Sequence, residues 1–154
     1  MVINSDDNKV EVTLVECIDG DTARFLVNGK EEKVRFLGID APESTNIQEE
    51  YGIDASNYTC GLLKNADDIY IEYDINSDRY DKYDRLLGWV FVDNNNLSEL
   101  LVLKGYAEVK YIYNNYKYVA NLCDSQKDAY NNRVGIWTNQ YSEYEDNYCF
   151  KNNY

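Results

Sequence analysis

The chain has 154 residues, enough for one domain with a single hydrophobic core. Its 28 acidic and 15 basic residues give a net charge of −13, which disfavours tight electrostatic binding to long polyanions. It contains no histidine, which excludes Ser-His-Asp triads, Cys-His dyads, His-ligated zinc and histidine general bases. Acid–base or metal chemistry must therefore use carboxylate, lysine, arginine, tyrosine or cysteine side chains.

The first part of the chain predicts a polar segment, a strand and a β-hairpin. We expect residues 1–7 to be flexible. Alternating apolar residues then predict three strands, at residues 9–18, 21–28 and 31–38. Asn28-Gly29, between the last two, is a strong hairpin signal, because both residues tolerate the positive φ of a type I′ turn.

The predicted register of this hairpin gathers charged residues at its open end. If Val27 pairs with Lys30, counting along the strands places Thr22 opposite Arg35. Five charged side chains then converge, namely Asp19, Asp21, Arg35, Asp40 and Glu43. Four carboxylates beside one guanidinium are costly unless a cation and an anion occupy the site. The pattern therefore predicts a site for a hard divalent metal together with a phosphate.

The rest of the chain predicts three helices and two further strands. An acidic loop is expected at 44–52, and the elements follow as a helix at 53–65, strands at 69–73 and 87–92, and helices at 97–104 and 117–132. The run Asp93 to Asn96 predicts a turn that also caps the next helix, and Gly105 predicts the end of that helix.

These elements predict one domain. Five short strands with helices at the ends are typical of an α+β fold, a small five-stranded OB-type β-barrel with three α-helices. We expect the domain at 8–137 and a polar C-terminal tail at 138–154. No stretch is apolar for long enough to span a bilayer, and no signal peptide is visible at the start of this chain.

Four cysteines are widely spaced along the chain. The sequence has no C-x-x-C pair, so it does not predict a structural zinc site. Three disulfide pairings are possible, and the spacing favours none of them. We expect Cys17 and Cys123 to be buried thiols. A disulfide that tethers the tail through Cys149 and an unpaired Cys149 are equally open alternatives.

Several motifs resemble the staphylococcal nuclease-like, or thermonuclease, family over roughly residues 8–137. They are IDGDT (18–22), VRFLGIDAPE (34–43), DKYDRLLG (81–88), AEVKYIY (107–113) and VGIW (134–137). The family has the OB-type barrel fold predicted above.

The resemblance also implies a set of site residues. It implies Ca²⁺ bound by Asp21, Asp40 and the Ala41 carbonyl, with Asp19 contributing through water, and catalysis by Glu43, Arg35 and Arg85. It further implies a nucleotide pocket lined by Lys82, Tyr83, Tyr111 and Tyr113. The family commonly has glycine where this chain has Asp84, which could pair with Arg85 or repel phosphate.

By this resemblance the chain is expected to be a Ca²⁺-dependent phosphodiesterase. It would hydrolyse DNA and RNA with little sequence preference, favour single-stranded or frayed substrate, and leave 3′-phosphate ends. It would act as a monomer, secreted or attached to the cell envelope after removal of a leader, with the cytoplasm as an alternative. Two other functions stay open: a catalytically weak or inactive domain that binds nucleic acid or a protein partner, and a calcium-stabilised structural domain.

Overall fold

The computed structural model describes residues 8–44, 49–139 and 144–154. The predicted flexible segment 1–7 and the middle of the predicted acidic loop lie outside the described residues. The elements run β1 (Lys9–Asp19), β2 (Thr22–Val27), β3 (Lys30–Phe36), β4 (Ile39–Asp40), α1 (Gly52–Asn65), β5 (Ile69–Glu72), β6 (Leu86–Val92), β7 (Asn95–Asn96), α2 (Leu97–Leu103), β8 (Glu108–Val109), α3 (Val119–Asn132), the 3₁₀ helix η1 (Gly135–Thr138) and α5 (Tyr148–Lys151).

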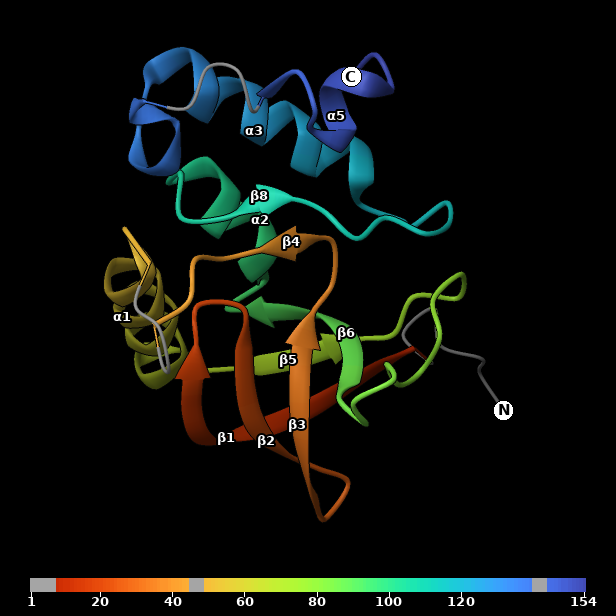
Figure 1. Cartoon of the computed structure of the whole chain (residues 1–154). Helices are drawn as coiled ribbons and strands as arrows, with labels where there is room; N and C mark the ends of the chain where they lie inside the picture. The colour runs from red at the N-terminus through yellow and green to blue at the C-terminus, as the bar shows by residue number, and fades with distance from the viewer. Residues whose placement is uncertain (1–7, 45–48, 140–143) are drawn as a thin grey trace.

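Five strands form the closed barrel that the sequence predicts (Figure 1). They are ordered β3-β2-β1-β5-β6, and a parallel pairing of β3 with β6 closes the ring, with Arg35 opposite Leu87. The hairpin register is confirmed, because Val27 pairs with Lys30 and Thr22 pairs with Arg35. The turn between them has positive φ at Asn28 and Gly29, as a type I′ turn requires.

The three predicted helices are present with small shifts at their ends. The first, α1, begins one residue earlier than predicted, and α3 begins two residues later. The Asn96 side chain accepts a hydrogen bond from the Ser98 N–H and so caps α2, and Gly105 follows α2 with a φ of 75°. The sequence did not predict the two-residue strands β4, β7 and β8, nor the short helix α5.

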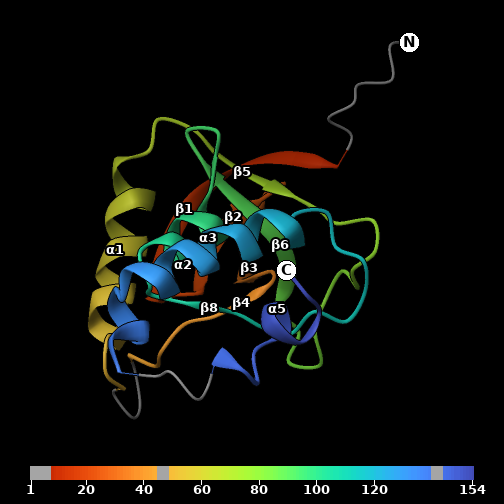
Figure 2. The same cartoon turned by 90° about the horizontal axis from the view of Figure 1, so that it is seen from above.

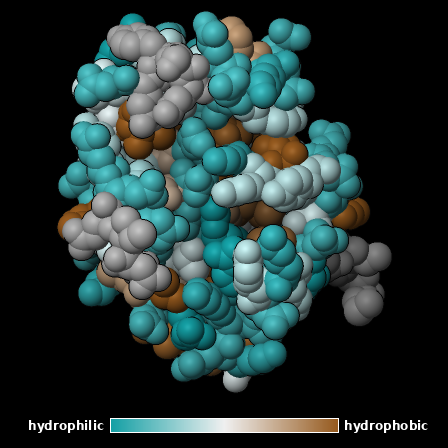
Figure 3. Space-filling model, in the orientation of Figure 1, coloured by the Kyte–Doolittle hydropathy of each residue, from teal (hydrophilic) through white to brown (hydrophobic). Residues whose placement is uncertain are grey.

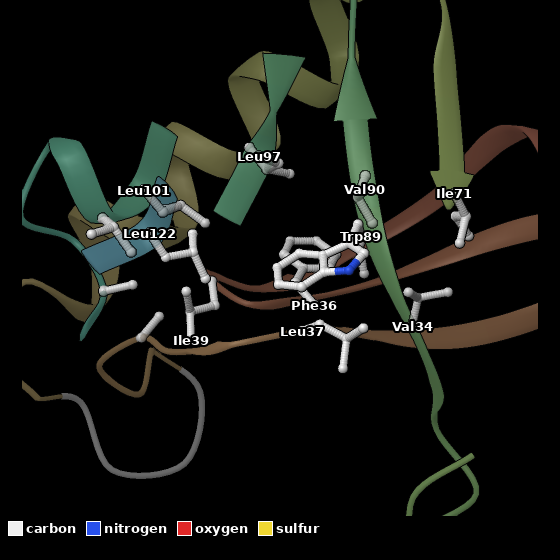
Figure 4. Close-up of a cluster of buried hydrophobic side chains, with 14 of the residues drawn as sticks. Val34, Phe36, Leu37, Ile39, Ile71, Trp89, Val90, Leu97, Leu101 and Leu122 are labelled. Atoms are coloured by element: carbon white, nitrogen blue, oxygen red, sulfur yellow. The ribbon is translucent and has the colours of Figure 1, made fainter. Parts of the chain in front are cut away.

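The core lies between the barrel and the helices that cover one end of it. Trp89 of β6 is fully buried beside Phe36 and Leu37 of the β3 end, and Leu101 and Leu122 approach from α2 and α3 (Figure 4). Viewed from above, α2 and α3 cross over this end of the barrel (Figure 2). Close packing of such large side chains keeps the strand ends that carry charged residues in place.

All four cysteines form disulfides, and this corrects part of the sequence prediction. Cys17 of β1 bonds Cys60 of α1, and Cys123 of α3 bonds Cys149 of α5. Of the two alternatives left open for Cys149, the structure has the disulfide, whereas the predictions of unpaired thiols at Cys17 and Cys123 are wrong. The bonded cysteines are 43 and 26 residues apart in the sequence, so only the three-dimensional packing determines which cysteines pair.

The described part of the predicted C-terminal tail packs on the domain. Tyr144 stacks on Tyr130 of α3 with ring centroids 4.0 Å apart, and Cys149 is fully buried.

Most of the molecular face seen in Figure 3 is hydrophilic, with apolar residues scattered over it. Among the described residues, no helix is long and apolar enough to cross a membrane.

Candidate active site

An ion-paired cluster of three residues lies at the open end of the β2–β3 hairpin. The Arg35 guanidinium lies 3.2 Å from the Asp21 carboxylate and 3.7 Å from that of Asp40. The Ala41 N–H donates to Asp21 at 2.8 Å, which places Asp21 directly against the Asp40–Ala41 backbone. Asp21 and Arg35 are both less than a tenth exposed. The predicted convergence of these residues is thus confirmed.

The turn that carries Asp19 and Asp21 is fixed by contacts with α1. The Thr59 hydroxyl donates to the Gly20 carbonyl at 2.6 Å. A side chain at Gly20 would meet Ala41 and Ala55 at 2.9 Å, so only glycine allows this close approach. The Ser44 hydroxyl hydrogen-bonds to Asp19, which brings Asp19 beside the segment that follows Ala41.

Glu43 lies at the surface next to this cluster, and backbone contacts hold it there. Its N–H donates to the Glu49 carboxylate at 2.9 Å, and its carbonyl accepts from the Glu49 N–H at 2.9 Å. Gly52 packs against the Glu43 carbonyl so closely that a Cβ would not fit. The Glu43 side chain therefore extends from a fixed backbone.

Burial and neighbouring carboxylates raise the pKa values of Asp40 and Glu43. Burial raises the pKa of Asp40, the nearby Asp21 charge adds to this, and Arg35 and Lys110 oppose it. Burial also raises the pKa of Glu43, followed by its hydrogen bond with Asp19 and the charges of Asp19 and Asp21. The site thus holds more negative charge than its own arginine neutralises.

The residues present fit a hard cation that also takes backbone and water ligands. Among the described residues, no three acidic or cysteine side chains form a metal cluster by themselves. Asp21 and Asp40 together with the adjacent Ala41 carbonyl offer hard oxygen donors, and Ca²⁺ accepts carboxylate, carbonyl and water ligands. The unrelieved repulsion at Asp40 is the feature that a cation would remove.

A second charged group lies on the loop before β6. The Arg85 Nε donates to Asp81 at 2.8 Å, and the Arg85 guanidinium also lies 5.3 Å from the Tyr83 ring centroid. Burial opposes ionisation of Asp81, but hydrogen bonds from the N–H groups of Arg85 and Tyr83 and from the Arg85 side chain hold its pKa below the usual value. Lys82 lies 5.2 Å from the same ring. This loop leads directly into β6. Because β6 pairs in parallel with β3, the strand of Arg35, the loop lies at the same end of the barrel as Arg35.

The two remaining predicted tyrosines follow β8. The Tyr111 ring lies 5.7 Å from the Arg35 guanidinium, and Tyr113 lies 6.4 Å from Tyr111 and is mostly exposed. β8 reaches this position because it pairs with β4, with Glu108 opposite Asp40. The structure therefore joins Tyr111 directly to the cluster and Tyr113 through Tyr111.

A cavity of about 300 Å³ adjoins the site beside Asp40. Its lining includes four carboxylates, those of Asp40, Glu49, Glu50 and Glu108, and one ammonium group, that of Lys110. One side of the cluster is therefore acidic, whereas the side that carries Arg85 and Lys82 offers exposed aromatic and basic groups.

A comparison with known protein families shows which family this fold belongs to. The family model described as staphylococcal nuclease homologue matches residues 33–139, more than half of the chain. The chain belongs to the staphylococcal nuclease family.

Individual relatives of this nuclease-family chain carry nuclease names. It is 38% identical over 133 residues to Endonuclease YncB of Bacillus subtilis, which covers 84% of this chain and 62% of the relative. It is 38% identical over 133 residues to the SPbeta prophage-derived endonuclease YokF of the same organism, covering 84% of this chain and 44% of the relative. It is 32% identical over 138 residues to the Thermonuclease of Staphylococcus hyicus, covering 88% and 80%. The chain therefore spans less than two thirds of the two Bacillus proteins.

One departure from the family pattern has a structural explanation. The resemblance implies glycine at the position of Asp84, and the φ of Asp84, 61°, lies in the left-handed region that favours glycine. Of the two alternatives for Asp84, pairing with Arg85 is not the one found, because in the described part of the chain the carboxylate that pairs with Arg85 is that of Asp81.

Three residues of the site escaped the sequence reasoning. Lys110 lies 3.7 Å from Asp40 and 3.6 Å from Glu108, Glu49 holds the Glu43 backbone, and Asp81 orients Arg85. Lys110 and Asp81 fall inside motifs of the nuclease family, which was a usable signal. Glu49 had no such signal, because its side chain accepts from a backbone amide, that of Glu43, across a loop.

Proposed function

We propose that the chain is a Ca²⁺-dependent nuclease that hydrolyses DNA and RNA with little sequence preference and leaves 3′-phosphate ends. The observation that carries the proposal is the Asp21–Arg35–Asp40 cluster, in which Asp21 and Arg35 are buried and Asp40 half-buried, with the Glu43 backbone fixed beside it. The nuclease names of relatives that match 84% and 88% of the chain support the same reaction class.

Each residue of the cluster has a distinct role in this reaction. Asp21, Asp40 and the Ala41 carbonyl would hold Ca²⁺, which when bound supplies positive charge to a phosphate oxygen. Arg35 and Arg85 present planar guanidinium groups that can each bind two phosphate oxygens and stabilise the charge that develops during attack. Glu43 accepts a proton from the attacking water or orients it, because no histidine is present to do so.

The substrate in this proposal is unpaired or frayed nucleic acid. The aromatic side chains of Tyr83 and Tyr113 are 67% and 78% exposed, so bases that are not paired can stack on them. Lys82 lies against Tyr83 and would meet a phosphate there. The net charge of −13 predicts weak binding to long polyanions, and the contacts of Lys82, Arg35 and Arg85 with phosphates would weaken as salt rises.

Arginine variants test the assigned roles. We expect Arg35→Ala and Arg85→Ala each to lower kcat for a single-stranded oligodeoxynucleotide by about 10²-fold, since each removes a group that stabilises transition-state charge. The matched control is Arg24→Ala, because Arg24 pairs with Glu16 on β1 instead of with the cluster. The account is wrong if Arg24→Ala lowers kcat as much as the other two. End-group analysis of the wild-type products should give 3′-phosphate.

Calcium should stabilise the folded protein, and more so at neutral than at acid pH. A raised pKa at Asp40 means that the metal-free folded state binds this proton more tightly than the unfolded state. This carboxylate therefore costs stability above its raised pKa, and the cost disappears as pH falls through it. At 100 times its Kd, Ca²⁺ would add about 2.7 kcal/mol at pH 7, or about 5–11 °C in Tm.

Thermal melts with Ca²⁺ and with chelator at pH 7 and pH 5 measure this effect. Asp40→Asn should abolish most of the Ca²⁺-induced rise in Tm. An equal rise in Asp40→Asn and wild type would place the calcium elsewhere.

Asp84→Gly should improve substrate binding. The substitution removes one negative charge beside Arg85 and suits the left-handed backbone at this position. A unit charge about 10 Å from a phosphate interacts by about 0.4 kcal/mol in water, so KM should fall about twofold. Steady-state kinetics at low salt measure it, with Asp78→Gly as a control for loss of charge on the same loop.

A binding role without turnover is the second candidate, and the acidic surface together with Asp84 favours it. Such a domain would bind a single-stranded oligonucleotide or a protein partner but release no product with Ca²⁺.

For the location we propose secretion or attachment to the cell envelope, because two disulfides persist best in oxidising compartments. We further propose that it acts as a monomer.

A further inference from the structure

The outer edge of β8 is bound by side chains instead of by a neighbouring strand. On its inner edge β8 pairs with β4, and the Lys110 N–H donates to the Gly38 carbonyl at 3.0 Å. On the outer edge, the Val109 N–H donates to Gln126 of α3 at 2.7 Å, and the Val109 carbonyl accepts from the Asn147 amide at 3.1 Å. Two side-chain amides therefore take the place of a third strand. Figure 1 shows α3 and α5 on the side of β8 that faces away from β4.

These two amides also bind one another, and both are buried. The Gln126 Nε2 donates to the Asn147 Oδ1 at 2.6 Å, and the same oxygen accepts from the Cys149 N–H at 2.9 Å. Asn147 thereby caps α5, whose Cys149 is disulfide-bonded to Cys123 of α3. The disulfide and the cap fix Asn147 at the β8 edge.

The residues that follow Val109 contact the candidate active site. Lys110 lies 3.7 Å from Asp40, and Tyr111 lies 5.7 Å from the Arg35 guanidinium. Asn147 itself lies beyond residue 139, where the match to the family model ends.

We propose that Asn147 is a positioning residue for substrate binding, which through the Val109 carbonyl holds Lys110 and Tyr111 against Asp40 and Arg35. The proposal rests on the proposed nuclease function for its substrate, single-stranded nucleic acid. The Asn147 amide contacts no reacting atom. Its loss therefore weakens the placement of the Tyr111 side of the site, while Glu43 and Asp21, held by other contacts, stay in place.

Asn147→Asp is the sharpest variant. It keeps the oxygen that accepts from Gln126 and Cys149 but replaces the donor to Val109 with an acceptor. Asn152→Asp is the matched control, because it makes the same change in the same segment, where the Asn152 amide bonds only the local Tyr148 carbonyl. Asn147→Ala provides a second variant that adds no charge.

Steady-state kinetics on a single-stranded oligodeoxynucleotide with Ca²⁺, and hydrogen exchange of the Lys110 amide, test the proposal. For Asn147→Asp we expect KM to rise about fivefold, as for loss of one buried hydrogen bond, with kcat within about twofold of wild type. The Lys110 amide, which donates to the Gly38 carbonyl just before β4, should exchange about tenfold faster. Asn152→Asp should change neither quantity.

Three results would overturn the proposal. One is an unchanged KM in a folded Asn147→Asp protein, and another is an equal rise in KM for Asn152→Asp. The third is an unchanged rate of hydrogen exchange at the Lys110 amide in both Asn147 variants. This third result can be obtained even if the wild type fails to cleave the oligonucleotide. In that case the proposed function has failed, and the exchange measurement alone decides the role of Asn147.

Discussion

Glu43→Gln should lower kcat on single-stranded DNA by about 10²–10⁴-fold, with little change in KM. The amide keeps the shape of the side chain but cannot accept a proton from water. Glu43 is exposed, and the hydrogen bonds that place it use its backbone and Glu49, so the substitution leaves these contacts intact.

A measurement of thermal stability distinguishes a loss of catalysis in Glu43→Gln from misfolding of the variant. Burial raises the pKa of Glu43, and its hydrogen bond with Asp19 and the charges of Asp19 and Asp21 raise it further, so an uncharged side chain relieves both effects in the metal-free protein. The Tm of Glu43→Gln in chelator should therefore equal or exceed that of wild type. A kcat of Glu43→Gln within about threefold of wild type would show that Glu43 takes no part in proton transfer. Glu43 would then only add negative charge near the cation.

Removing either disulfide should produce the largest loss of stability. Cys17→Ser/Cys60→Ser and Cys123→Ser/Cys149→Ser open covalent loops of 43 and 26 residues, which corresponds to about 3–4 kcal/mol of unfolding free energy each. For a domain of this size, the Tm should fall by about 10 °C per disulfide. Thermal melts under non-reducing conditions measure the difference.

The two disulfides should also differ in their effect on activity at a temperature where both variants are folded. Loss of Cys123–Cys149 frees the segment that carries Asn147, so it should raise KM as the Asn147 variants do. Loss of Cys17–Cys60 loosens α1 next to Thr59, which binds the Gly20 carbonyl in the turn between Asp19 and Asp21. It should therefore weaken the calcium response. A Tm unchanged by reduction would show that the disulfides contribute no stability.

Local signals in the sequence predicted the central hairpin and the helix ends. Asn28-Gly29 fixes the turn, and a period of two then fixes the register, so Thr22 had to lie opposite Arg35. Asn96 and Gly105 determine where α2 begins and ends through one hydrogen bond and one positive φ. Each of these signals acts within a few residues of its own position.

Contacts between distant segments escaped prediction. The parallel closure of β3 on β6 and the pairing of β4 with β8 involve strands or strand ends of two or three residues, too short to show any periodicity. The disulfide partners depend on which helix faces which strand. The polar composition of residues 138–154 gave no sign that Asn147 would be buried against Val109, because its polar groups are satisfied inside the protein.

The same distinction holds for the site. Asp21, Arg35 and Asp40 belong to or directly follow the hairpin, and their convergence followed from its register. Arg85 lies beside Asp81 for a local reason, in that the Asp81 carboxylate binds two backbone N–H groups and the guanidinium of one turn. The place of Lys110 beside Asp40 required the β4–β8 pairing and could not be derived from spacing alone.

Hydrolysis of heat-denatured DNA at low salt, with saturating Ca²⁺ and then with excess chelator, tests the central claim most directly. We expect the wild-type protein to release short 3′-phosphorylated products with Ca²⁺ and none after chelation, and we expect added Ca²⁺ to restore the reaction. Cleavage that persists in chelator would contradict the assignment of Asp21 and Asp40 to a catalytic cation. Tight binding of the DNA without release of product would instead make the chain a nuclease-like binding domain.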